Sequence, residues 1–245
     1  MQRSISYQQL TTKLESGNKM NKEKDKTSYE ESLNRHLLTQ QTTMPIFRIR
    51  RPIEEVKSII TQAYTNEVLN RGNVAEFDEF LYGIVETISN YITDTENSKK
   101  AGMIFVGGTG NGKTTMAKAL KKVIHAYAEM GEFGDYKKYY HPKFVNARMI
   151  SDYFVKGNAD ELMYSQVLIV DDLGVEATEE VVYGNIISPI RMLFESRYDN
   201  RLYTIITTNL DAEQLKEKYG IRITDRFKEI LCKINFGTNN SFRKQ

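Results

Sequence analysis

A glycine-rich segment between an apolar run and a helical pattern constrains the fold more than any other feature. Residues 103–115 read MIFVGGTGNGKTT, and the pattern G-x-x-x-x-G-K-[ST] is matched by Gly107, Gly112, Lys113 and Thr114. The glycines let the backbone turn tightly and aim several N–H groups at one point, while the following helix adds the positive end of its dipole. The segment therefore predicts a phosphate-binding loop.

The loop residues divide the expected chemistry among them. The Lys113 ammonium would reach the outer phosphates of a nucleotide, and the Thr114 hydroxyl would bind Mg²⁺. We predict that the nucleotide is ATP and that the whole loop binds it, through Gly107, Gly108, Thr109, Gly110, Asn111, Gly112, Lys113, Thr114 and Thr115. A chance glycine-rich turn is the alternative, and the flanking strand and helix argue against it.

A second apolar run ends in two carboxylates. Residues 167–172 read VLIVDD. At the carboxyl end of a strand, one Asp can help to hold magnesium and a second acidic group can polarise the attacking water. We assign Asp171 to the metal, together with Thr114, and Asp172 to the water. A pair of surface acids at a strand end is the alternative interpretation.

A third apolar run, residues 204–208, is followed by Asn209. The Asn209 amide would orient the water near the terminal phosphate. On this residue alone, an ordinary helix cap is the favoured interpretation, because Asn is common at that position.

Short apolar runs alternate with helical patterns from residue 101 onward, which is typical of an α/β fold with a parallel sheet flanked by helices. We expect strands near 103–106, 143–146, 167–171, 203–207 and 232–236. Helices are expected at 113–129, 147–156, 179–198 and 211–231, the last one broken at Gly220. Two amphipathic helices precede the sheet, one from Ile53 to just before Gly72 and one from Phe77 to Tyr91.

The N-terminal segment has a different composition. Residues 1–45 are rich in Gln, Thr, Ser, Asn and Lys and cannot bury enough apolar surface to fold alone. Residues 1–51 hold ten Lys or Arg and five Asp or Glu, whereas the whole chain has a net charge of +2. A basic arm can attract nucleic acid or an acidic partner surface, but a solvated tail is an equally good interpretation.

Cysteine usage and hydropathy restrict the cellular compartment in which the protein is expected. The single cysteine, Cys232, excludes a disulfide framework and a Cys-rich zinc site. The first twenty residues are polar, and no apolar run approaches the roughly 20 residues that a membrane-spanning helix needs. We expect a cytoplasmic protein with no membrane partner.

The motifs together resemble those of AAA+ ATPases of the DnaC/DnaI helicase-loader and IstB-like transposition-helper group. The resemblance covers roughly residues 75–245 and lies in GGTGNGKTT at 107–115, VLIVDDLG at 167–174, TIITTNL at 204–210 and GIRITDRF at 220–227. It implies a P-loop NTPase with a five-stranded parallel sheet, in which one strand is inserted between those bearing the loop and the Asp pair. It also implies an AAA+ ATPase domain at 71–245 and a flexible to helical, partner-binding region at 1–70.

The resemblance assigns roles to further residues. Asn209 becomes the sensor of the terminal phosphate, and Arg226 becomes an arginine finger that reaches the nucleotide of a neighbouring subunit, with Arg222 as a second candidate. A cation supplied by a neighbour stabilises charge on the transferred phosphoryl group and makes hydrolysis depend on assembly, which implies a homo-oligomer formed with ATP. Pairing of Arg226 with a local acid such as Asp225 or Glu229 is the alternative.

The sequence departs from the family pattern in three places. Asp172 stands where most AAA+ enzymes have Glu, and the side chain, shorter by one methylene, would make hydrolysis slow. Nine residues follow the last expected strand, which leaves no room for a full C-terminal helical lid, and Arg243 is the candidate substitute for a lid arginine. The N-terminal zinc module of DnaI is not matched in this chain.

The resemblance implies two macromolecular partners, the replicative DNA helicase, bound through residues 1–70, and single-stranded DNA. Base stacking on aromatic side chains beside basic residues is the general route to single strands. Candidate contacts are Tyr153, Phe154, Lys156 and Tyr183, and the cluster Lys137, Lys138, Tyr139, Tyr140 and His141. Most of the 15 tyrosines must be core or neutral surface.

Four functions remain open at this point. An ATP-dependent loader of the replicative helicase is our main hypothesis. An IstB-like helper that binds target DNA for a transposase has the same ATPase domain, and a nucleotide-gated adaptor with negligible hydrolysis fits Asp172. A small-molecule kinase would need a substrate pocket and lid, and the strands at 167–174 and 204–209 argue against it.

Overall fold

A five-stranded parallel sheet organises the part of the chain that the structure describes, residues 47–94, 100–132, 140–177, 179–182 and 185–237. In this computed structural model the strands lie in the order β2-β3-β6-β1-β7. Their bounds are β1 Gly102–Val106, β2 Lys143–Asn146, β3 Val167–Leu173, β6 Tyr203–Thr208 and β7 Cys232–Asn235. The five predicted strands are confirmed, with ends that differ by no more than two residues.

The strand order brings the predicted site residues to one edge of the sheet. β6 lies between β1 and β3, with Gly102 opposite Thr204 on one side and Val167 opposite Tyr203 on the other. The predicted insertion of one strand between the loop strand and the Asp strand is therefore confirmed. Because the three strands are parallel, their carboxyl ends meet, and the glycine-rich loop, the Asp pair and Asn209 follow those ends.

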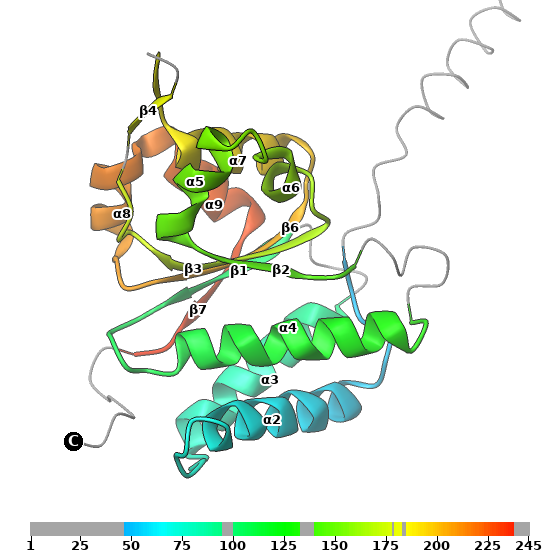
Figure 1. Ribbon diagram of the computed structural model, residues 1–245. Coiled ribbons are helices and arrows are strands. Elements are labelled where there is room, and N and C mark those ends of the chain that lie inside the picture. The colour runs from blue at the N-terminus through cyan, green and yellow to red at the C-terminus, as the bar shows by residue number, and fades with distance from the viewer. Residues whose placement is uncertain (1–46, 95–99, 133–139, 178, 183–184, 238–245) are drawn as a thin grey trace, which may run out of the picture. The chain divides into compact units, whose positions relative to one another are not determined.

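Helices cover both faces of the sheet (Figure 1). One face carries α2 (Ile53–Leu69), α3 (Glu79–Thr93) and α4 (Lys113–Glu129). The other face carries η2 (Ala147–Met149), α5 (Ile150–Val155), α6 (Asp160–Met163), α7 (Pro189–Asp199), α8 (Ala212–Tyr219) and α9 (Ile221–Ile230). The predicted helix at 113–129 is confirmed, as is the break at Gly220, whose φ of 81° favours glycine.

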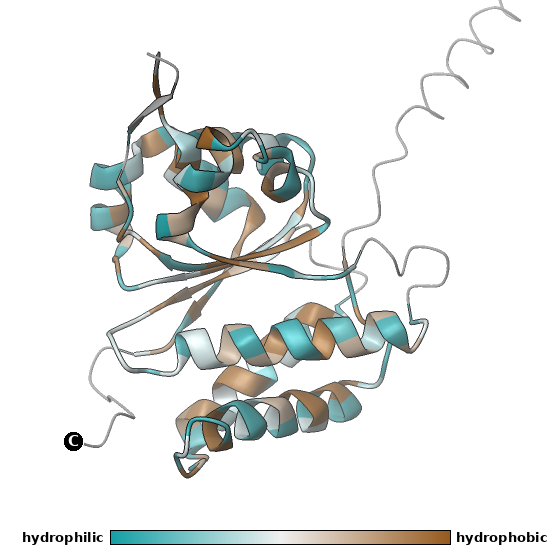
Figure 2. Cartoon of the chain, viewed as in Figure 1, coloured by the Kyte–Doolittle hydropathy of each residue, from teal (hydrophilic) through white to brown (hydrophobic). Residues whose placement is uncertain are grey.

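Alternation along the strands creates two apolar cores. Met103 and Phe105 of β1 face α2, α3 and α4, whereas Ile104 between them belongs to the core under α7 and α9. In Figure 2 the apolar colours gather in the strands and on the sides of the helices that face them. No helix within the described ranges is both long enough and apolar enough to span a membrane.

Helix α2 belongs to the packed unit, which runs from Pro45 to Gln245. Val56, Ile60 and Tyr64 of α2 are buried in the core that also contains α4. Just before this helix, the Ile49 backbone N–H donates to the Ile92 carbonyl at 2.9 Å. Of the region expected at 1–70, residues 1–46 lie outside the described residues.

The predicted helix at 179–198 is wrong in its first part. Strands β4 (Glu180–Val182) and β5 (Asn185–Ile187) pair antiparallel, and α7 begins only at Pro189. Proline lacks a backbone N–H and disfavours a helical conformation at the residue before it, so one helix does not run through this position. The β-branched residues of both strands also favour a hairpin over a helix.

Candidate functional site

The glycine-rich loop joins β1 to α4 through backbone conformations that require glycine. Gly112 caps α4 with φ 82°, and Gly110 has φ 89°. A Cβ atom at Gly112 would lie 2.5 Å from the Tyr64 hydroxyl oxygen, which is closer than such atoms approach one another. Both the local turn and the contact with α2 therefore select glycine at position 112.

Lys113 is the buried cation of the loop. Its Nζ donates to the carbonyl oxygens of Gly107 at 2.8 Å and Gly108 at 2.7 Å, and only 5% of the residue is exposed. Burial lowers the pKa of the Lys113 ammonium, while the charges of Asp172 and Asp171 act in the opposite direction. The side chain is thus held at the N-terminus of α4, where an anion would contact both the ammonium and the backbone N–H groups of the first helical turn.

Asp171 and Thr114 meet across the gap between β3 and α4. Asp171 Oδ1 accepts hydrogen bonds from the hydroxyls of Thr114 at 2.9 Å and Thr207 at 2.7 Å. Burial raises the pKa of the Asp171 carboxyl, and these two hydrogen bonds oppose that shift. A hydroxyl and a carboxylate oxygen this close together are the hard oxygen donors that Mg²⁺ prefers, so the residues fit the metal predicted for them.

Asp172 is directed away from the strand by an irregularity in β3. The β3–β6 register shifts between Val170 and Leu173, and Asp172 has φ 57° while its N–H donates to Thr207 Oγ1 at 2.9 Å. A bulge of this kind re-aims a side chain, and Asp tolerates the left-handed region better than most residues. Asp172 lines the hollow in front of the loop, and so does Asn209 at the end of β6.

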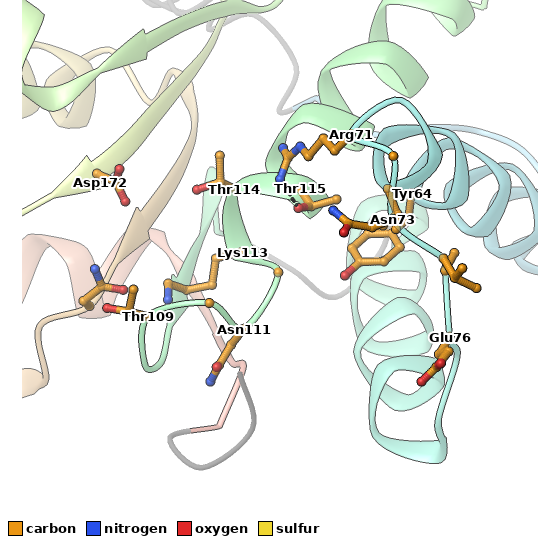
Figure 3. Close-up of a pocket in the computed structure, with 17 residues that line it drawn as sticks. Tyr64, Arg71, Asn73, Glu76, Thr109, Asn111, Lys113, Thr114, Thr115 and Asp172 are labelled. Atoms are coloured by element: carbon orange, nitrogen blue, oxygen red, sulfur yellow. Dashed lines mark hydrogen bonds between the residues drawn. The ribbon is translucent and has the colours of Figure 1, made fainter. Parts of the chain in front are cut away.

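The hollow has a volume of about 530 Å³ and two walls (Figure 3). Residues 109–115, Asp172 and Asn209 form one wall, and residues 71–76 between α2 and α3 form the other together with Tyr64 and Val68. Arg71 links the two walls, because its Nη1 donates to Thr115 Oγ1 at 2.9 Å. From the sequence, this wall is predicted only as the end of the helix that begins at Ile53 and stops before Gly72, and no motif marks it.

Two loop residues form hydrogen bonds with the residues that directly follow β7. The Gly108 N–H donates to the Gly237 carbonyl at 2.9 Å, and Asn111 Nδ2 donates to the Phe236 carbonyl at 3.0 Å and to that of Gly237. Asn111 therefore fixes the position of the loop as well as lining the hollow. Nucleotide contacts of Gly107, Gly108 and Asn111 stay predictions.

Arg226 lies on α9, where it pairs with acids of α7 in the same chain. Its Nη1 is 3.5 Å from Glu195 Oε1 and its Nη2 is 3.8 Å from Asp199 Oδ1, while its guanidinium carbon lies 4.6 Å from the centre of the Tyr198 ring. The local pairing that we considered thus occurs with Glu195 and Asp199. Arg222 also approaches Glu195, at 3.3 Å, and neither arginine lines the hollow. A finger role for either stays a prediction.

The candidate DNA contacts differ in their accessibility. Phe154 and Tyr140 are buried in the two cores, so neither presents a free face to a base. Tyr153 is half-buried, and Lys156 and His141 are exposed. The remaining candidates lie outside the described residues: Lys137, Lys138, Tyr139 and Tyr183, and also Arg243.

The arrangement of β1, β6 and β3 decides the fold. A phosphate loop follows β1, an acidic pair ends β3, and β6 is inserted between these two strands with a polar residue at its end. The chain has a P-loop α/β fold. Lys113, Thr114, Asp172 and Asn209 line one hollow at the ends of three strands, and Asp171 is hydrogen-bonded to Thr114 beside it.

Three solved structures are among those to which this chain is similar. The DnaC helicase loader is 23% identical, with 70% of this chain and 97% of that chain covered and a TM-score of 0.48. DnaI is 19% identical, with 70% and 89% covered and a TM-score of 0.49. A putative primosome component from Streptococcus pyogenes serotype M3 is 15% identical, with 77% and 98% covered and a TM-score of 0.47. No protein-family model and no curated protein matches the sequence.

Proposed function

We propose that this protein is an ATP-dependent loader of the replicative DNA helicase, and that ATP and Mg²⁺ bind in the hollow between the phosphate loop and residues 71–76. The observation that carries the nucleotide site is the convergence of Lys113, Thr114 and Asp171 at the start of α4. The volume of about 530 Å³ lies within the range of about 300–1,000 Å³ that is usual for ligand pockets.

The two walls of the hollow match the two ends of ATP. The triphosphate lies along the loop, where Lys113 and the N–H groups at the start of α4 are available to a polyanion. The base lies toward the opposite wall, where Val74 is 79% exposed and the largely buried Tyr64 contributes the hydroxyl end of its ring beside Gly112. An aliphatic and aromatic lining suits a flat heterocycle better than it suits a phosphate.

Magnesium would be held by Thr114 and Asp171, and it would neutralise charge on the outer phosphates. The residues are already close enough to share one ion, because their oxygens are 2.9 Å apart. Asp172 would then hold the attacking water, with Asn209 as the sensor of the terminal phosphate. The shorter reach of Asp compared with Glu leads us to expect slow hydrolysis.

Assembly would complete the site through a cation from a neighbouring subunit. Arg226 is the residue that we propose, because its side chain is 18% exposed, its buried Nη1 has no hydrogen-bond partner among the described residues, and its longer ion pair, with Asp199, spans 3.8 Å. Such weak, partly solvated pairs cost little to exchange for a phosphate contact. ATP would therefore favour a homo-oligomer, and hydrolysis would release it.

We place the helicase contact in residues 1–70 and expect the oligomer to bind single-stranded DNA in the cytoplasm. An IstB-like helper that binds target DNA remains the second candidate, because its ATPase chemistry would be the same. A nucleotide-gated adaptor with negligible hydrolysis is a third candidate, because the short side chain of Asp172 favours slow hydrolysis.

The test is capture of the purified replicative helicase by the full-length protein, with ATP and with ADP. A variant that lacks residues 1–44 is compared with it, since the packed unit begins at Pro45. We expect capture that depends on ATP, is lost on truncation and is lost in Lys113→Ala. Absence of capture in every nucleotide state would overturn the loader proposal, and binding to duplex DNA and a transposase would then favour the helper.

A further inference from the structure

A second group of chemistry-bearing side chains lies on the far end of α4, away from the nucleotide hollow. His125 and Glu129 are four residues apart on this helix, and His141 precedes β2. The Nδ1 atoms of the two imidazoles are 3.0 Å apart, and His141 Nε2 lies 3.6 Å from Glu129 Oε1. One ligand atom from each of the three residues lies within 4.8 Å of those from the others.

The geometry points to a binding site for one divalent transition-metal ion, of which Zn²⁺ is the most suitable. In a tetrahedral zinc site the metal–nitrogen distance is about 2.0–2.1 Å, so neighbouring donors are about 3.3 Å apart. The Nδ1 atoms of His125 and His141, 3.0 Å apart, are close to this spacing, whereas the 3.6 Å contact of Glu129 is with the other nitrogen of His141, so Glu129 must rotate to share the ion. All three side chains are exposed, so small rotations can adjust them without disturbing the core.

The backbone already holds two of the ligands in position. Residues at i and i+4 of a helix lie on the same face, which places His125 and Glu129 side by side on α4. His141 is followed by Pro142, which restricts the backbone next to it. A metal ion would therefore tie the last turns of α4 to the start of β2.

The ligand types select the class of metal. Two imidazoles and one carboxylate suit Zn²⁺, Ni²⁺ or Cu²⁺, whereas Mg²⁺ and Ca²⁺ prefer an all-oxygen shell. His125 and His141 line a second hollow of the surface, together with Lys118, Lys121 and Lys122. The positive charges of these lysines disfavour a cation that is not held by strong ligands. Lys122 is already paired with Glu67 at 2.6 Å. The site is thus separate from the oxygen-rich magnesium site at Thr114 and Asp171.

Metal titration of the full-length, tag-free protein tests this site. After treatment with a chelator, Zn²⁺ is added against a competing indicator in the presence of excess Mg²⁺, and Co²⁺ is added in parallel to record its visible absorption. We expect one high-affinity equivalent of Zn²⁺ and an intense Co²⁺ spectrum typical of a four-coordinate ion. His125→Ala and His141→Ala should each weaken Zn²⁺ binding by about 100-fold, and Glu129→Gln by about tenfold.

The chain offers a matched control, because His36 is the only other histidine. His36→Ala should bind Zn²⁺ as the wild type does, and circular dichroism checks that every variant is folded. Failure of the wild type to bind Zn²⁺, or equal affinity in the wild type and in a His125→Ala/His141→Ala double variant, would overturn the proposal. Neither result depends on the helicase or on ATP.

Discussion

The Thr114 hydroxyl donates a 2.9 Å hydrogen bond to Asp171 Oδ1, and this contact joins the first turn of α4 to the end of β3. Thr207 on the intervening strand donates to the same oxygen at 2.7 Å. One carboxylate oxygen thus connects three elements that are far apart in the sequence. The buried Asp171 carboxylate therefore lies where a bound divalent cation would neutralise its charge.

Removal of the Asp171 charge should stabilise the protein in the absence of nucleotide. Burial raises the folded-state pKa of this carboxyl above its ordinary value of 3.8, so its ionised form opposes folding. We expect Asp171→Asn to raise Tm at pH 7 by about 2–4 °C, which is the shift that 1 kcal/mol produces in a domain of this size. The advantage of Asn should shrink as the pH falls and vanish below 3.8, since the wild-type carboxyl is then protonated in both states. Thermal unfolding across this pH range checks both statements.

Glu217→Gln is the control for that experiment, because Glu217 is exposed on α8 and the substitution removes the same charge. It should leave Tm within error at every pH. A lower Tm for Asp171→Asn at pH 7 would show that the ionised carboxylate stabilises the fold.

Gly112→Ala should damage the loop through two separable effects. Alanine is strained at φ 82°, at a cost of about 1–2 kcal/mol, and its Cβ would lie 2.5 Å from the Tyr64 hydroxyl oxygen. Tyr64→Phe removes that oxygen, and the next ring atom would be 3.5 Å away, an ordinary contact. We expect Tyr64→Phe to recover part of the stability lost in Gly112→Ala, as measured by urea unfolding of both single variants and the double variant. Strictly additive losses would refute the predicted contact.

Arg197 should be the most costly arginine to remove. Its side chain is 1% exposed, and it donates to the carbonyls of Leu162, Ser165 and Tyr203 and to Thr204 Oγ1. Burial lowers its pKa to about 9. Arg197→Met leaves those acceptors unsatisfied and should lower the free energy of unfolding by about 3 kcal/mol or more. Arg191→Met, at an exposed position of the same helix, should change it by about 0.5 kcal/mol or less. Similar losses in the two variants would contradict the account.

Subunit mixing tests whether Arg226 acts in trans. Lys113→Ala lacks a working nucleotide site but keeps Arg226, and Arg226→Ala has the reverse defect. If Arg226 completes a neighbour's site, each variant alone should have low ATP turnover and an equimolar mixture should recover a substantial part of the wild-type rate. ATP affinity of Arg226→Ala should stay close to wild type, and Arg191→Ala, at an exposed position of α7, serves as the matched arginine control. A mixture no more active than the sum of its parts would leave Arg226 with only its pairs to Glu195 and Asp199.

The sequence predicts the sheet well because its strands are uninterrupted apolar runs, as parallel strands buried on both faces must be. The five strands, the helix at 113–129 and the meeting of Lys113, Thr114 and Asp171 all follow from that pattern and from one motif. The antiparallel pair β4 and β5 is different, because strands of three residues are too short for their β-branched residues to outweigh the helical pattern expected at 179–198, and Pro189 marks where the helix begins.

Long-range polar contacts are the part that no local pattern reveals. Residues 71–76 form a wall of the hollow only because α2 packs against α4. Asn111 looks like one more loop residue in the sequence, yet its amide is bound to the end of β7. In the sequence Arg197 is one more cation of a helix, and its burial depends on carbonyls that two other segments supply, residues 162–165 and Tyr203.

The central claim is that Lys113 and its loop bind ATP. Equilibrium titration of a fluorescent ATP analogue with Mg²⁺ tests it most directly, with the wild type, Lys113→Ala and Lys121→Ala compared side by side. Lys121 is an exposed lysine on the same helix and controls for the loss of one charge. We predict that Lys121→Ala binds as the wild type does and that Lys113→Ala loses about 100-fold or more in affinity, a difference of about 2.7 kcal/mol. Unchanged affinity in Lys113→Ala would contradict the assignment of the nucleotide site.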